Sequence, residues 1–113
     1  MPPPNWWRID EISDALSLDA SQLKKLDAVQ KEHAETLAKL ERDLTAATKE
    51  LKAALESQPA VPEKIIAAGD RLGALRSTLF HTQIVMLAAQ RAILTRKQWT
   101  SLQEQGMRGP RPH

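Results

Sequence analysis

Residues 51–66 have the sequence LKAALESQPAVPEKII, and this stretch decides the fold because it separates two helical patterns. Pro59 and Pro62 cannot both lie inside one helix, since proline has no amide proton and its ring collides with the preceding turn. Pro62 does suit the first turn of a following helix, where an amide proton would have no partner. A connection this short predicts that the chain turns back here and that the two helices run antiparallel.

Apolar residues recur at alternating steps of three and four on both sides of this turn. The two series are Gln30, His33, Leu37, Leu40, Leu44, Ala47, Leu51 and Ala54, and then Ile65, Ala68, Leu72, Leu75, Leu79, Thr82, Met86, Ala89 and Ile93. Such unbroken spacing predicts coiled-coil-like packing, with both series on one seam. We therefore expect an all-α fold built on a long antiparallel hairpin, with helices over about 20–58 and 63–93.

The second long helix carries a further stripe that this seam leaves uncovered. Its members are Gly73, Ser77, Phe80, Ile84, Leu87, Arg91 and Leu94. A two-helix hairpin cannot bury both stripes, and an open apolar stripe is a liability in a monomer. We expect short flanking helices and a second copy of the chain to cover it, in a homodimer, with an unfolded client as the alternative occupant. Phe80, Ile84 and Leu87 are the candidate partner- or client-binding residues.

Two short helices are predicted at the ends of the hairpin, which gives four helices in all. The first runs from Trp6 to about Leu16, with Asn5 as its predicted cap. The second runs to about Gln105, and Gly106 is expected to end it.

Capping boxes mark two of the helix starts in the same way. The segments are LDASQ and LTRKQ, in which Asp19 and Thr95 are predicted N-caps. Gln22 and Gln98 stand three residues further on, where a side-chain amide reaches back to the backbone N–H of the cap.

Composition limits the function classes. The 113 residues suffice for one domain, predicted over residues 6–105 between a linker at 1–5 and a disordered basic tail at 106–113. The absence of cysteine excludes disulfides, thiol nucleophiles and Cys-based metal sites. A formal charge of +2, with bases spread among acids, offers no nucleic-acid-binding face. No apolar run is long enough to span a membrane, and no catalytic constellation is recognisable, so an enzyme is not expected.

Trp6 and Trp7 stand side by side. Two adjacent indoles are not expected to enter one small core. We therefore expect one to pack under the hairpin and the other to clamp a dimer partner. The alternative is that they anchor a partner or client, because tryptophan is frequent among interface hot spots.

His33 and Met86 are candidate metal ligands, since the hairpin register places them opposite each other and both side chains bind soft or borderline ions. Two ligands do not complete a site, and a polar seam residue with a gap-filling methionine explains the pair without metal. No cofactor is therefore expected.

The two capping boxes at the ends of a long hairpin resemble the periplasmic LTxxQ-motif proteins, which comprise Spy/CpxP-type stress proteins and heavy-metal-resistance sensors. LTRKQ matches the motif, LDASQ is similar to it, and LKAALESQPA before the turn is most similar to the CnrX-like nickel/cobalt-sensor branch. The likeness extends from about Ile9 to Leu102. It implies a dimeric helical hairpin in the periplasm that is not an enzyme, with a signal or membrane anchor in the full gene product.

The resemblance implies two kinds of role. Spy-type members bind unfolded clients, whereas the metal-sensor branch binds nickel or cobalt and signals to a membrane-bound partner. The ligands of that branch, carried over by position, fall on Ile9, Ser13, Gln30, Met86 and Gln90. Only Met86 is a good ligand, so we expect a sensor-type scaffold that acts through protein contacts without the nickel/cobalt site. The alternatives are an ATP-independent chaperone and a generic helical dimerisation module.

Overall fold

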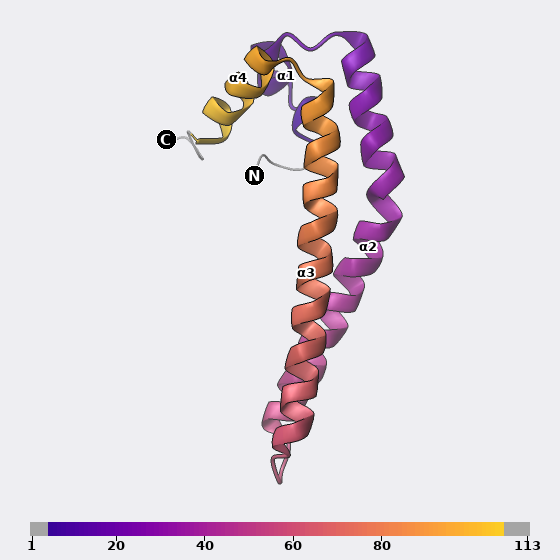
Figure 1. The fold of residues 1–113 in the computed structure, drawn as a ribbon, viewed down its shortest axis with the longest axis vertical. Coiled ribbons are helices and arrows are strands. Elements are labelled where there is room, and N and C mark those ends of the chain that lie inside the picture. The colour runs from indigo at the N-terminus through magenta and orange to yellow at the C-terminus, as the bar shows by residue number, and fades with distance from the viewer. Residues whose placement is uncertain (1–4, 108–113) are drawn as a thin grey trace. The chain divides into compact units, whose positions relative to one another are not determined.

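The computed structural model describes residues 5–107, with side chains described for residues 5–104. The elements are a 3-10 turn η1 (Trp6–Arg8), α1 (Asp10–Leu16), α2 (Ala20–Glu56), α3 (Pro62–Ile93) and α4 (Arg96–Met107). All regular secondary structure in this part of the chain is helical, which confirms the all-α prediction (Figure 1).

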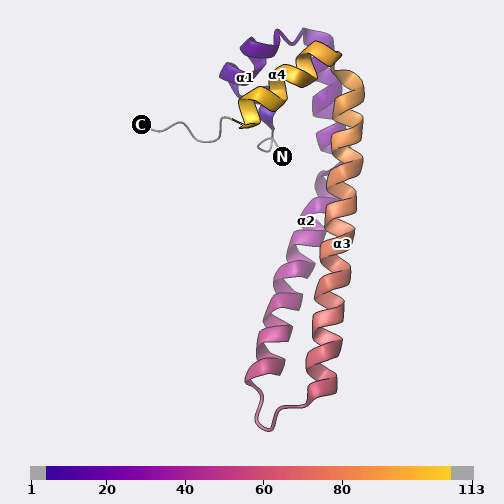
Figure 2. The same cartoon turned by 60° about the vertical axis from the view of Figure 1, so that its left-hand side comes forward.

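The turn between the long helices has the predicted form. The helix α2 ends at Glu56, and Pro62 is the first residue of α3. The Val61 carbonyl accepts the amide protons of Lys64 and Ile65 at 3.0 and 3.2 Å. These bonds form the first turn of α3. The two helices lie side by side as an antiparallel hairpin (Figure 2).

The chain divides into two compact units. We call the described part of the first unit, residues 5–32 and 86–107, the head, and the second unit, residues 33–85, the arm. The head contains η1, α1, α4, the start of α2 and the end of α3, and the arm contains the rest of the two long helices.

The arm is held by the predicted heptad seam. Leu40, Ala47, Ala68 and Leu72 are buried, and the other seam residues of both series are buried or half-buried. A salt bridge between Arg71 Nη1 and Glu50 Oε2, 3.1 Å apart, joins the two helices at the surface. Both of its side chains are more than half exposed, so it adds little to the burial of the leucine and alanine side chains.

The second stripe of α3 is open along the arm. Phe80 is 60% exposed and Ile84 is 40% exposed, and Ile66, one turn before the glycines, is 62% exposed. A Cβ placed on Gly69 or Gly73 would meet nothing within 4 Å. The hairpin therefore leaves this face uncovered, as the pattern predicted.

The prediction of one continuous helix from Trp6 to Leu16 was wrong. Ile9 is extended, with φ −84° and ψ 113°, and separates η1 from α1. Asn5 makes no side-chain cap, because its backbone is left-handed, with φ 53°. The break at Ile9 matters because a continuous helix would hold Trp6–Arg8 in line with α1. As a separate turn, η1 instead places the Trp6 and Trp7 side chains in the core.

The core of the head depends on that turn. Trp6 and Trp7 are both 2% exposed, and their rings meet edge-to-face at 5.5 Å between centroids. The buried cluster consists of Trp6, Trp7, Leu16, Leu26, Leu94 and Leu102. The expectation that two neighbouring indoles could not enter one core was therefore wrong, since a perpendicular arrangement lets both pack there.

The fourth helix is slightly longer than predicted. It continues to Met107, so Gly106 lies within α4 and does not end it. The predicted basic tail therefore begins with two helical residues, and its remainder, like residues 1–4 of the predicted linker, lies outside the described residues.

Candidate functional site

Both predicted capping boxes are present in the head. Asp19 Oδ1 accepts the Gln22 amide proton at 2.7 Å, and Gln22 Oε1 accepts that of Asp19 at 3.1 Å. Thr95 Oγ1 accepts the Gln98 amide proton at 3.1 Å, and Gln98 Oε1 accepts that of Thr95 at 2.9 Å. These bonds satisfy amide groups that a helix start leaves without intrahelical partners.

The two glutamines of these boxes also bind each other. Gln22 Nε2 donates to Gln98 Oε1 at 2.7 Å, and Gln98 Nε2 donates to Gln22 Oε1 at 3.1 Å. Their second amide protons go to the carbonyls of Ile93 and Leu16, at 3.3 and 3.2 Å. Each side chain thus makes two donor and two acceptor bonds, which is the full capacity of a glutamine amide. The pair ties the start of α2 to the start of α4.

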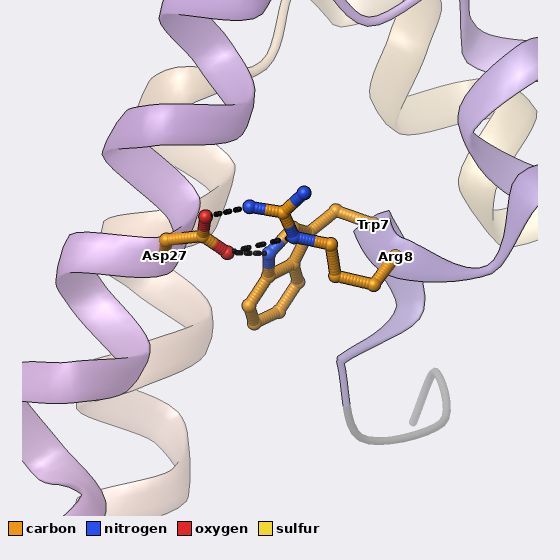
Figure 3. Close-up of polar contacts among 3 residues, drawn as sticks. All are labelled: Trp7, Arg8 and Asp27. Atoms are coloured by element: carbon orange, nitrogen blue, oxygen red, sulfur yellow. Dashed lines mark hydrogen bonds and ion pairs between the residues drawn. The ribbon is translucent and has the colours of Figure 1, made fainter.

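A second polar group surrounds η1. We call Trp6, Trp7 and Arg8 with their partners Asp27 and Gln90 the clasp. Trp7 Nε1 donates to Asp27 Oδ1 at 2.7 Å, Arg8 Nε donates to the same oxygen at 3.0 Å, and Arg8 Nη2 pairs with Asp27 Oδ2 (Figure 3). Trp6 Nε1 donates to Gln90 Oε1 at 3.4 Å, and Gln90 is only 7% exposed. The clasp thus joins one turn to both α2 and α3.

The charge of Asp27 is stabilised by its donors. The hydrogen bond from Arg8, followed by that from Trp7, lowers the pKa of the Asp27 carboxyl below its ordinary value. Both charged side chains of this pair remain partly exposed, at 57% for Arg8 and 42% for Asp27. Water therefore screens the ion pair, whereas the Trp7 indole that donates to the same carboxylate is buried.

The candidate metal ligands His33 and Met86 do not lie in one unit. His33 is half-buried in the arm, and Met86 is 8% exposed in the head. Among the described residues, no group of three or more His, Cys, Asp or Glu side chains is placed to hold a metal ion.

The positions onto which the resemblance carries the nickel/cobalt ligands hold side chains of a different chemistry. Ile9 is apolar, Ser13 and Gln30 are neutral and half-buried, and none of the five positions carries an imidazole or a carboxylate. The Oε1 of Gln90 already accepts the proton of Trp6. Nickel and cobalt bind imidazole and carboxylate donors in preference to neutral amides and hydroxyls, so this residue set does not fit the ion.

The candidate partner-binding residues fall into two groups. Trp6 and Trp7 are enclosed by the head of their own chain, so neither presents a surface to a partner. Phe80 and Ile84 are exposed on the arm, and Leu87, in the head, is half-buried. The first group belongs to the core, and of the second group Phe80 and Ile84 remain exposed for contact.

Sequence reasoning missed Arg8 and Asp27. An exposed arginine and an aspartate 19 positions further along the chain carry no motif, and only the fold brings them together. The identical form of the two capping boxes was a signal that Gln22 and Gln98 are related, but their mutual bonds depend on the position of α4.

A family model described as heavy-metal resistance matches residues 7–101. The chain belongs to the heavy-metal resistance family. The match includes both capping boxes, the whole hairpin and every residue of the clasp except Trp6. Comparison with curated proteins and with solved structures gives no significant match. Within residues 5–107, none of the helices has the length and apolar character needed to cross a membrane.

Proposed function

We propose that this family member is a non-enzymatic sensor or accessory protein of heavy-metal resistance that works in the periplasm through protein contacts. It does so without nickel or cobalt at the positions used by the CnrX-like branch. The observation that carries this proposal is the combination of the family match over residues 7–101 with Gln90, whose side-chain oxygen is engaged by Trp6 where a metal ligand is expected.

The metal part of the proposal is tested by calorimetric titration of the protein with Ni(II), Co(II), Zn(II) and Cu(II). We expect no binding at micromolar ion concentrations. Binding that is micromolar or tighter and is abolished by Met86→Ala or His33→Ala would show that the protein does carry a working site. His81→Ala is the matched control, because this histidine is exposed on α3.

The contact surface that we propose is the open stripe of α3, covered by a second copy of the chain. Phe80 and Ile66 are each about three-fifths exposed, and the glycines between them leave room for close approach of another helix. Analytical ultracentrifugation is expected to give a dimer, and Phe80→Ser to weaken it. The control is His81→Ser on the neighbouring face. A wild-type protein that stays monomeric at high micromolar concentration would refute this arrangement.

A second candidate function is that of a Spy/CpxP-like holdase, which the same exposed apolar side chains favour. In that case the stripe binds unfolded clients, and the protein suppresses the aggregation of a chemically denatured test protein without ATP. Phe80→Ser is then expected to reduce the suppression. No suppression at a tenfold molar excess of the protein would rule this candidate out.

A further inference from the structure

The open stripe of α3 is symmetric about Gly73 along part of the arm. Ile66 and Phe80 lie seven residues before and after this glycine, and Gly69 and Ser77 lie four residues before and after it. Since each residue of a helix turns the chain by about 100°, all five lie within about 40° of one direction around the axis of α3. The stripe therefore has a large apolar side chain at each end, with Ile66 62% exposed and Phe80 60% exposed, and three small residues between them.

The two glycines are not needed for the packing of their own hairpin. Gly69 and Gly73 lie inside α3, where glycine is less favourable than alanine. A Cβ placed on either of them would meet nothing within 4 Å, so no described residue of the same chain requires the space. What the glycines do provide is a bare stretch of backbone, which a second helix can approach closely.

Two charged side chains border the stripe with the same symmetry. Asp70 and Arg76 lie three residues before and three residues after Gly73, and the helical turn places them on opposite sides of the stripe. Both are exposed, and neither makes a hydrogen bond or salt bridge with any described residue. In an antiparallel second copy centred on Gly73, Arg76 would lie level with Asp70. A parallel copy would set each charge level with its own like charge, which disfavours that orientation.

We infer that a second copy of the chain covers this stripe in an antiparallel arrangement, with the two-fold axis at Gly73. Each Ile66 packs against Phe80 of the other copy, and each Asp70 lies beside Arg76 of the other copy, as a two-fold interface requires. The seven-residue spacing of Ile66, Gly73 and Phe80 suits helices that cross at about 20°, as in a coiled coil. This inference rests on the dimer in the proposed function, which it deepens by giving the orientation and register of the partner.

The first experiment uses disulfide cross-linking, for which the chain is suited because it contains no cysteine. A disulfide forms only between residues whose Cα atoms are about 4.4–6.8 Å apart. We expect a mixture of Ile66→Cys and Phe80→Cys to give a covalent dimer on mild oxidation, detected by non-reducing electrophoresis. The mixed dimer keeps its other contact between Ile66 and Phe80. Neither variant alone should cross-link, because each position lies about 21 Å along the pair from its own copy.

The matched control is a mixture of Ala74→Cys and Phe80→Cys, since Ala74 is exposed but these two positions are about 12 Å out of register. Circular dichroism verifies that each variant is folded. Cross-linking of Ile66→Cys or Phe80→Cys alone, as fast as in their mixture, would show that the copies run parallel and would overturn the inference. So would a mixture that gives no more covalent dimer than the control.

The second experiment exchanges the charges. Asp70→Arg sets two arginines beside each other, and we expect the Kd of the dimer in analytical ultracentrifugation to rise about tenfold at low salt. The double variant Asp70→Arg/Arg76→Asp restores opposite charges and should recover most of the lost affinity. Glu56→Arg, exposed at the end of α2, changes the net charge equally and should leave the Kd unchanged. A double variant that dimerises no better than Asp70→Arg would contradict the register.

The outcomes separate this inference from the proposed function. If wild type stays monomeric at high micromolar concentration, the proposed dimer itself fails, and the stripe is left to an unfolded client. If wild type dimerises but the cross-links and the charge exchange do not give the expected pattern, only the antiparallel arrangement about Gly73 fails.

Discussion

The head and the arm of this protein are built from the same two long helices but are stabilised in different ways. The arm is stabilised by a repeated apolar seam, in which Leu40 and Leu72 are buried at heptad positions. The head places large aromatic side chains among polar groups, several of which make hydrogen bonds between distant segments, such as Gln22 with Gln98. The comparison teaches that a repeated apolar pattern is enough to hold two long helices together. A polar site such as the clasp also requires hydrogen bonds that fix individual side chains.

Trp7→Ala is expected to have the largest effect, because it removes a side chain that is 2% exposed together with the indole donor of Asp27. Loss of a buried aromatic side chain destabilises by about 3–5 kcal/mol. Hydrogen exchange should show faster exchange in the head while arm amides near Ala47 keep their protection. Equal loss of protection in both units would mean that head and arm unfold as one.

Leu40→Ala tests the arm in the same way. Leu40 is 8% exposed on the seam, and truncation of a buried leucine should cost about 2–5 kcal/mol, measured by urea unfolding. Leu55→Ala is the control, since Leu55 is 58% exposed and should change stability little. If the two variants were equally stable, the heptad seam would not be the source of the arm's stability.

The glutamine pair gives the next largest effect. Gln22→Ala leaves Gln98 without one acceptor and one donor, which should cost about 1–3 kcal/mol, and Gln98→Ala should act likewise. The double variant should be more stable than the sum of the single losses implies, by about 0.5–3 kcal/mol of coupling. Gln103→Ala, exposed on α4, is the control. Strict additivity in the cycle would contradict mutual bonding.

Asp27 is expected to give the smallest effect, visible as a dependence on pH. Because its folded-state pKa is lowered, the contribution of this carboxylate is present above the ordinary Asp range and is lost as the pH falls through the folded-state pKa. Asp27→Asn should therefore flatten the acid side of the stability curve of the head. Asp43→Asn, half-buried on α2 in the arm, should leave that curve in place.

Local features were predictable because they depend on neighbours in the chain. The turn at Pro62, the seam through Leu40 and the box at Asp19 each require residues within a few positions of one another, together with a known helical period. The break at Ile9 was not predictable in this way. Its apolar neighbours fit the helical period, and the gain from burying both tryptophans outweighs the helical preference of a single residue.

The candidate site was predictable only in part. Gln22 and Gln98 were found as caps, whereas their mutual bonds join residues 76 positions apart. Gln90 was identified only as a position that had lost a metal ligand, and its bond to Trp6 spans 84 positions. No local pattern records such a pairing, since it requires the long hairpin to bring the two ends of the chain together.

The sequence by itself therefore determined the two long helices, the turn between them and the face of each long helix that is buried, because periodicity and proline act over a few residues. The tertiary structure alone decided that both indoles enter the core of the head, and that Asp27 and Gln90 are their acceptors. The physical reason is that a buried N–H must find an acceptor wherever the fold provides one, and that position is set by the packing of all the segments of the head.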